Sequence, residues 1–149
     1  MIKRDNRIME SICNKCMTDP TSHSFRKISE KNGVCTYYTN PTKAKLYTDT
    51  DGILSHYDNA LRLVGNKKWI WIFDSDGFDL KHALEIKTGT GIAKLLTDKY
   101  ADNLQEIKII NPTWHIKAML KAVWPFLNQR TRDKIKILKD RYYSILEFV

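Results

Sequence analysis

The hydrophobic positions of this chain follow two patterns, one typical of strands and one typical of helices, which alternate along the sequence. Residues 69–73 (WIWIF) form a continuous apolar run between lysines and an Asp-Ser-Asp-Gly turn, which predicts a central strand buried on both faces. Residues 52–64 carry apolar side chains at helical spacing, after capping residues at Thr50 and Asp51. This alternation of strands and helices predicts an α/β fold with a largely parallel sheet flanked by helices.

The other elements are predicted from the same patterns and from turn residues. Residues 24–30 fit either a short helix or an extended segment. The sequence Thr88-Gly-Thr-Gly91 is expected to break a helix, because glycine is a poor helix former, and it lacks the Gly-Lys-Ser/Thr of a phosphate loop. Further strands are expected at 34–39, 44–47, 106–110 and 134–138, and further helices at 7–15, 79–87, 92–100, 113–127 and 142–148.

The length of 149 residues and the hydrophobic content of 42% suit one domain with one core. We divide the chain into an N-terminal helical or irregular extension at 1–32 and a ligand-binding domain at 33–149. No apolar run reaches about 18 residues, so no membrane span is predicted. Residues 1–13 are charged throughout and lack the apolar centre of a secretory signal.

The formal net charge of +8 favours anionic partners. The lysines are scattered and accompany no nucleic-acid motif, so no nucleic-acid partner is expected. The basic surface is interpreted first as ordinary solvated surface, and second as a means of transient attraction to an anionic membrane, at about 1 kcal/mol per lysine.

Three cysteines without a secretory signal indicate a reducing, cytoplasmic setting, peripheral to membranes. The abundance of Lys, Ile and Asn is typical of AT-rich genomes. If the source is a virus or a parasite, that cytoplasm would be the cytoplasm of a host cell.

The most informative stretch is 111–138, which contains an Asn-Pro turn, an amphipathic helix, Trp-Pro-Phe-Leu and a strand. Earlier in the chain, the buried strand ends in Asp74, and the helix after it is followed by Tyr100-Ala-Asp-Asn103. This order resembles the CRAL-TRIO family of lipid-binding domains over roughly 33–148. In that family, a Tyr-Pro-Glu-like element stands where this chain has Tyr100-Ala-Asp-Asn103. The resemblance implies a minimal phosphatidylinositol-transfer-like domain without the helical N-terminal subdomain. Such a domain would bind one lipophilic ligand, a phosphoinositide or another phospholipid, and transfer or present it.

The resemblance implies two residues for the lipid headgroup. In phosphatidylinositol-binding members, an acid after the tyrosine and a lysine at the start of the final strand contribute to headgroup binding. These two residues match Asp102 and Lys134. A lysine suits a phosphate because it offers a compact charge with several donors. The alternative interpretation is that Lys134 only flanks a strand and Asp102 caps a helix.

The helix at 113–127 matches the gate that covers the family's lipid cavity. Its broad apolar stripe would face acyl chains, or would pack on the sheet as ordinary core. Trp69 and Trp71 are implied to line the cavity, and their bulk would narrow or fill it, which disfavours a choline phospholipid. The stripe consists of Trp114, Ile116, Met119, Leu120, Val123, Trp124 and Leu127.

Residues 111–117 (NPTWHIK) also resemble the BCH branch of the same superfamily, which has His-Pro-Thr-x-Phe-Ile-Lys. That branch binds small GTPases and forms dimers. The alternative function is therefore a protein-interaction scaffold with a filled core and no lipid cargo, which binds a small GTPase or forms a homodimer.

Cys13, Cys16, His23 and Cys35 offer four zinc ligands of the preferred N and S types. Their spacing contains no second Cys-x-x-Cys or His pair, so free thiols are the preferred interpretation. We therefore predict no metal and no other cofactor.

The other polar residues give no catalytic pattern. The aspartates after the central strand fit turn and helix caps, and no spacing typical of Ser-His-Asp or Cys-His catalysis is present. No enzyme activity is predicted. The remaining histidines look isolated in the sequence, and they are His56, His82 and His115.

Overall fold

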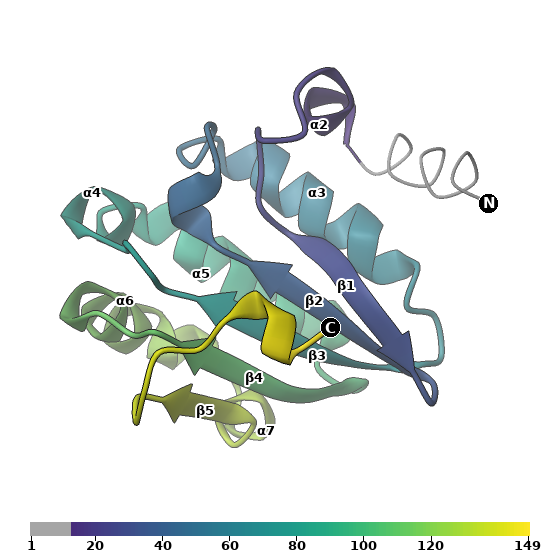
Figure 1. Cartoon of the computed structure of the whole chain (residues 1–149). Coiled ribbons are helices and arrows are strands. Elements are labelled where there is room, and N and C mark those ends of the chain that lie inside the picture. The colour runs from purple at the N-terminus through teal and green to yellow at the C-terminus, as the bar shows by residue number, and fades with distance from the viewer. Residues whose placement is uncertain (1–12) are drawn as a thin grey trace.

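The computed structural model describes residues 13–149, and a five-stranded sheet lies at its centre (Figure 1). The strand order is β1-β2-β3-β4-β5; β1 pairs antiparallel with β2, and the other neighbours are parallel. The predicted α/β fold with a largely parallel sheet is confirmed. The strands are β1 (Arg26–Lys31), β2 (Val34–Thr39), β3 (Lys68–Asp74), β4 (Leu104–Ile110) and β5 (Ile135–Leu138).

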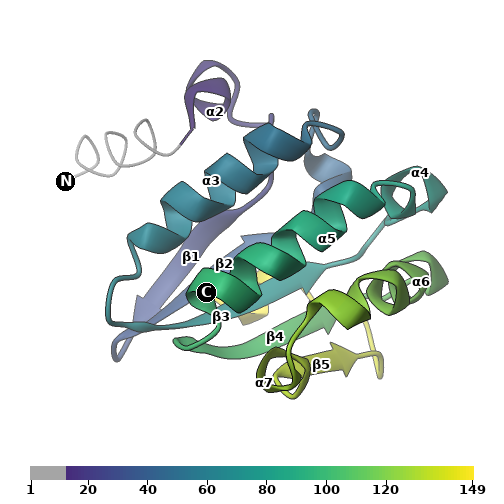
Figure 2. The same ribbon diagram turned by 180° about the vertical axis from the view of Figure 1, so that it is seen from behind.

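Three helices cover one face of the sheet (Figure 2). They are α3 (Thr50–Arg62), α5 (Ile86–Leu95) and α6 (Trp114–Val123). Within residues 13–149, no helix has the length and apolar character needed to cross a membrane. The shorter elements are α2 (Asn14–Thr18), α4 (Leu80–Ala83), α7 (Gln129–Arg132), the π-helical turn Leu96–Tyr100, and the 3₁₀ turns Pro41–Lys43, Trp124–Phe126 and Ile145–Glu147.

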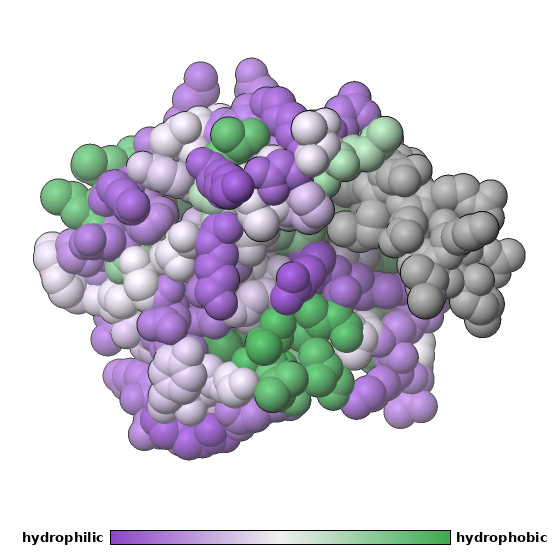
Figure 3. Space-filling model, turned by 45° about the horizontal axis from the view of Figure 1, so that its top comes forward, coloured by the Kyte–Doolittle hydropathy of each residue, from purple (hydrophilic) through white to green (hydrophobic). Residues whose placement is uncertain are grey.

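The C-terminal segment crosses the opposite face of the sheet (Figure 1). There, Ile72 of β3 and Ile110 of β4 are buried against Tyr143, Ile145 and Phe148. Strand β3 is thus covered on both sides, as its continuous apolar sequence predicts. A compact hydrophobic patch interrupts a largely hydrophilic surface in the view of Figure 3.

Asn111 fastens this C-terminal segment to the end of the sheet. Its φ of 52° lies in the left-handed region, which asparagine tolerates better than most residues. Its Nδ2 donates to Asp74 Oδ1 (3.0 Å) and to the Tyr143 carbonyl (2.9 Å), and its Oδ1 accepts from the Tyr143 amide (2.8 Å). The Asn-Pro turn therefore both redirects the chain and holds the segment that covers the second face.

The expected helix break at 88–91 is wrong, because α5 runs through it. A Cβ at Gly89 would lie 2.9 Å from Met119 Sδ of α6, and one at Gly91 would lie 2.9 Å from Leu54 Cδ1 of α3. The glycines therefore allow α5 to pack closely between two neighbouring helices, and this packing outweighs their low helix propensity. The break falls earlier, at Leu84 and Glu85, which divides the helix predicted at 79–87.

The strand predicted at 44–47 is also wrong. Pro41 starts a 3₁₀ turn capped by Asn40, and the amides of Lys45 and Leu46 then donate to the carbonyls of Thr21 and Ser22 (both 2.9 Å). These backbone groups are therefore satisfied by a loop rather than by a strand of the sheet.

The two ends of the described chain differ from expectation as well. At 142–148 the predicted helix is only a 3₁₀ turn. Most of the helix predicted at 7–15 lies outside the described residues, and α2 begins at Asn14. The ambiguous segment 24–30 is extended as β1, and Phe25 beside it is buried in the main core, so the sheet and core begin before residue 33.

Candidate ligand-binding pocket

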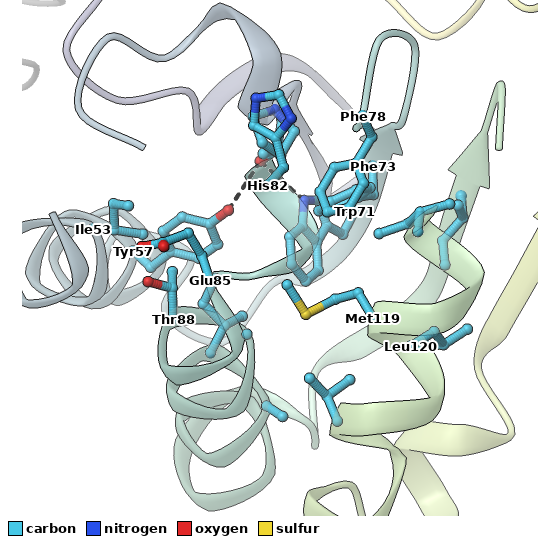
Figure 4. A pocket seen from close by; sticks show the side chains of 18 of the residues that line it. Ile53, Tyr57, Trp71, Phe73, Phe78, His82, Glu85, Thr88, Met119 and Leu120 are labelled. Carbon is cyan, nitrogen blue, oxygen red and sulfur yellow. Dashed lines mark hydrogen bonds between the residues drawn. The ribbon is translucent and has the colours of Figure 1, made fainter. Parts of the chain in front are cut away.

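An apolar pocket of about 160 Å³ lies between the sheet and helices α3, α5 and α6 (Figure 4). Its floor is formed by side chains of β3 and β4, because alternate residues of a strand point to the same face. Trp71 and Phe73 come from β3, and Ile107 and Ile109 from β4. The pocket therefore occupies the part of the core where the sheet and α6 face each other.

The polar atoms of the aromatic wall bond to one another. The Trp71 Nε1 donates to Thr39 Oγ1 (3.1 Å), and the Thr39 and Tyr57 hydroxyls lie 3.4 Å apart. Burial raises the pKa of Tyr57, so its hydroxyl stays neutral. The wall consequently presents mainly apolar ring surface to the cavity, a property suited to a hydrocarbon ligand.

Helix α6 and the turn after it contribute one side of the pocket. Five residues of the predicted stripe line it: Ile116, Met119, Leu120, Val123 and Leu127. The two tryptophans do not, since Trp114 is 71% exposed and Trp124 is 36% exposed. The stripe is thus narrower than the sequence suggests, and its tryptophans lie toward solvent.

The two tryptophans predicted to line the cavity have different positions. Trp71 lines the pocket, whereas Trp69 is buried outside its lining, with Nε1 donating to the Tyr100 carbonyl (3.1 Å). Within the pocket, the indole of Trp71 fills space that a smaller residue would leave open.

Lys134 and Asp102 lie near each other but outside the pocket lining. The Lys134 Nζ donates to the Ala101 carbonyl (2.6 Å), and Asp102 pairs with Arg130 (Oδ1 to Nη1, 2.7 Å). Burial lowers the pKa of Lys134, and the charge of Arg130 acts in the same direction. Ile135, which follows Lys134 directly, does line the pocket.

One part of the pocket wall is polar and was not anticipated from the sequence. It includes His82, Glu85 and Thr88, and the Thr88 Oγ1 lies 2.6 Å from the Thr50 Oγ1 of α3. The buried His82 accepts at Nδ1 from the Asp79 amide (3.1 Å), which completes the cap of α4. The only sequence signal for this arrangement is the spacing of Asp79 and His82 at a helix start.

A family comparison identifies this architecture. The model of the CRAL/TRIO domain matches residues 43–149, which is most of the chain, and the chain therefore belongs to the CRAL/TRIO domain family. Such domains generally bind lipophilic ligands and are typically not enzymes.

The solved structures that are similar to this chain include the crystal structure of Sfh5. The TM-score is 0.66 at 13% sequence identity, and the match covers 93% of this chain and 56% of the Sfh5 chain. The chain thus spans little more than half the length of Sfh5. At this identity, the likeness shows the fold alone.

Proposed function

We propose that this protein binds one phospholipid, with the apolar part of the lipid between the sheet and α6. The observation that carries the proposal is the apolar pocket, which lies under α6 and has its aromatic polar atoms satisfied internally. Family membership supports a lipophilic ligand in general, and the narrower assignment to a phospholipid is our proposal.

The pocket volume requires that binding be accompanied by movement. A volume of about 160 Å³ resembles the cavity of about 150 Å³ that holds benzene, and it lies below the roughly 300–1,000 Å³ of pockets that enclose drug-sized ligands. A phospholipid therefore needs a wider pocket, and we propose that α6 moves away from the sheet to provide it.

Helix α6 is suited to such a movement at both ends. It starts at the Thr113 cap after a turn, and it changes at Trp124 into a 3₁₀ turn that contains Pro125. Proline has no amide hydrogen to continue the helical bonding, so this turn is a natural place for the backbone to bend.

Exposed apolar residues on adjoining helices would bring the protein to a membrane. Leu80 of α4 is 55% exposed, Leu84 at its end is 67% exposed, and Trp114 starts α6. Helices α4 and α6 pack against each other, and tryptophan suits the membrane interface. The net charge of +8 would add attraction to an anionic leaflet.

We assign the headgroup to Lys134, with Asp102 beside it. Lys134 adjoins pocket-lining Ile135, and the positive charge of Arg130 is close enough to influence it. The charge of Lys134 would attract a phosphate, and the lysine retains donors beyond the one that it gives to Ala101.

The test compares Lys134→Met, directly before β5, with Lys136→Met, at an exposed lysine on β5. Affinities for phosphatidylinositol and for an uncharged lipid are measured by transfer from fluorescent vesicles. We expect Lys134→Met to weaken phosphatidylinositol binding about fivefold, equivalent to about 1 kcal/mol, and to leave binding of the uncharged lipid unchanged. Equal effects of the two variants would refute the headgroup assignment.

A scaffold that binds a small GTPase or a second copy is the alternative function. It is favoured by Trp71, whose indole occupies part of the pocket, and by the solvent-exposed Trp114. Absence of any lipid from the purified protein, together with a stable dimer or a GTPase complex, would select this alternative.

A further inference from the structure

Four potential metal ligands converge beside the N-terminal end of the described chain. Cys13 and Cys16 flank the start of α2, His23 precedes β1, and His56 lies on α3. Their ligand atoms all lie within 4.8 Å of one another. Because Cys13 and Cys16 share one segment while His23 and His56 come from two others, the convergence of the three segments is a product of the fold.

Three distances between a cysteine sulfur and a histidine nitrogen are close to those of a tetrahedral zinc centre. The His23 Nδ1 lies 3.3 Å from Cys13 Sγ and 3.7 Å from Cys16 Sγ, and the His56 Nδ1 lies 3.6 Å from Cys16 Sγ. With Zn–S near 2.3 Å and Zn–N near 2.0–2.1 Å, the S···N edge of a tetrahedron is about 3.6 Å. A zinc ion can therefore be placed among these atoms with little rearrangement.

Both imidazoles are held in the orientation that metal binding requires. The His23 Nε2 lies 3.0 Å from Asp49 Oδ2, and the His56 Nε2 lies 2.7 Å from the Phe25 carbonyl. Each acceptor fixes the ring hydrogen on Nε2 and leaves the Nδ1 lone pair directed at the thiols. A carboxylate or a carbonyl on the outer nitrogen is the usual support of a metal-bound histidine, and this is an observation independent of the ligand spacing.

The backbone around the cysteines supports the same interpretation. Cys13 is the N-cap of α2, and its Sγ accepts from the Cys16 amide (3.4 Å). This bond holds the Cys13 side chain over the first turn of α2, on the same side as Cys16. Cys16 and the two histidines are buried, a setting in which two thiolates and one Zn²⁺ would cancel each other's charge.

We propose that Cys13, Cys16, His23 and His56 form a closed structural zinc site that ties residues 13–23 to α3. Four protein ligands leave no open position, which is typical of structural rather than catalytic zinc. His23 also lines the lipid pocket, so the zinc would fix part of the pocket wall.

This proposal changes the ligand set that the sequence suggested and replaces the prediction of no metal. Cys35 is not a member, because its Sγ lies 3.6 Å from Glu30 Oε1 on the β1–β2 hairpin. His56, which looks isolated in the sequence, takes the fourth position.

The first test is the metal content of the full chain, purified without a histidine tag under reducing conditions in the presence of zinc. We expect about one zinc per chain by elemental mass spectrometry. Titration of the metal-free protein with Co²⁺ should give the visible bands of a tetrahedral ion and a thiolate charge-transfer band. Less than about 0.1 zinc per chain, with no cobalt spectrum, would overturn the proposal.

The second test uses Cys13→Ser, at the most exposed of the four ligands, and Cys35→Ser as the matched control. We expect Cys13→Ser to weaken zinc binding at least tenfold and Cys35→Ser to leave it unchanged. If Cys13→Ser does not fold, alkylation of the wild-type protein replaces this test. Zinc should protect Cys13 and Cys16 from alkylation and should not alter the labelling of Cys35. A Cys13–Cys16 disulfide that persists in the presence of zinc and reductant would contradict the proposal.

Discussion

The closeness of α5 to its neighbours makes Gly89→Ala an informative perturbation. The new Cβ would lie 2.9 Å from Met119 Sδ and 3.0 Å from Val123 Cγ1. The thioether of Met119 can move away, but a β-branched valine in a helix has one strongly preferred rotamer. The clash with Val123 therefore has to be relieved by a shift of α5 or α6.

Two opposing effects set the magnitude. Replacing a helical glycine by alanine gains about 1 kcal/mol, and overpacking a core costs about 1–3 kcal/mol. We therefore expect Gly89→Ala to lower the free energy of unfolding by about 0–2 kcal/mol. Gly91→Ala is the matched control: its Cβ would meet Leu54 Cδ1 at 2.9 Å, and Leu54 is half-buried and can rotate. This variant should be up to about 1 kcal/mol more stable than the wild type.

Urea titrations of the two variants, followed by tryptophan fluorescence, measure this difference, and thermal melts should show about 2–4 °C per kcal/mol. Gly89 lines the pocket and Gly91 does not, so only Gly89→Ala should also weaken lipid binding. If Gly89→Ala is more stable than the wild type, the close approach of α5 and α6 is not as described.

Two further predictions concern α6 and the polar part of the pocket wall. The Thr113 hydroxyl accepts from the Ile116 amide (3.3 Å) and donates to the Phe78 carbonyl (2.8 Å). In urea titrations, Thr113→Ala should therefore lower the free energy of unfolding by about 1–2 kcal/mol, and Thr113→Ser should retain most of the wild-type stability. Equal losses in the two variants would argue against the cap. Burial lowers the pKa of His82 in the folded protein. The stability that neutral His82 contributes should therefore be present above its unfolded-state pKa of about 6.5 and be lost as the pH falls below that value. Unfolding curves at several pH values should show that His82→Gln loses less stability on acidification than the wild type, and equal losses in the two proteins would contradict a neutral His82.

Much of the fold can be predicted from local patterns, and the failures have a common cause. The run at 69–73 identifies a covered central strand, and helical spacing places Met119 and Val123 toward the sheet. The glycines of α5 mislead because their role is contact with other helices, which local propensity does not contain. Likewise, 44–47 has strand-like residues whose amides bond to a distant loop.

The candidate sites show the same limit more clearly. Nothing in the sequence relates His56 to Cys13, because only the packing of α3 beside α2 brings them together. The position of Trp114 is likewise set by geometry: the first residue of α6 points to solvent although it continues the apolar stripe. Residue type identifies the candidates, but tertiary contacts decide which of them meet.

The pocket under α6 is proposed to take up one lipid. The decisive experiment is native mass spectrometry of the protein purified from eukaryotic cells, with lipid analysis of its organic extract. We expect one adduct per chain that resolves to a single phospholipid class, separate in mass from any bound zinc. A folded protein with no lipid adduct and an empty extract would contradict the account and favour the scaffold function.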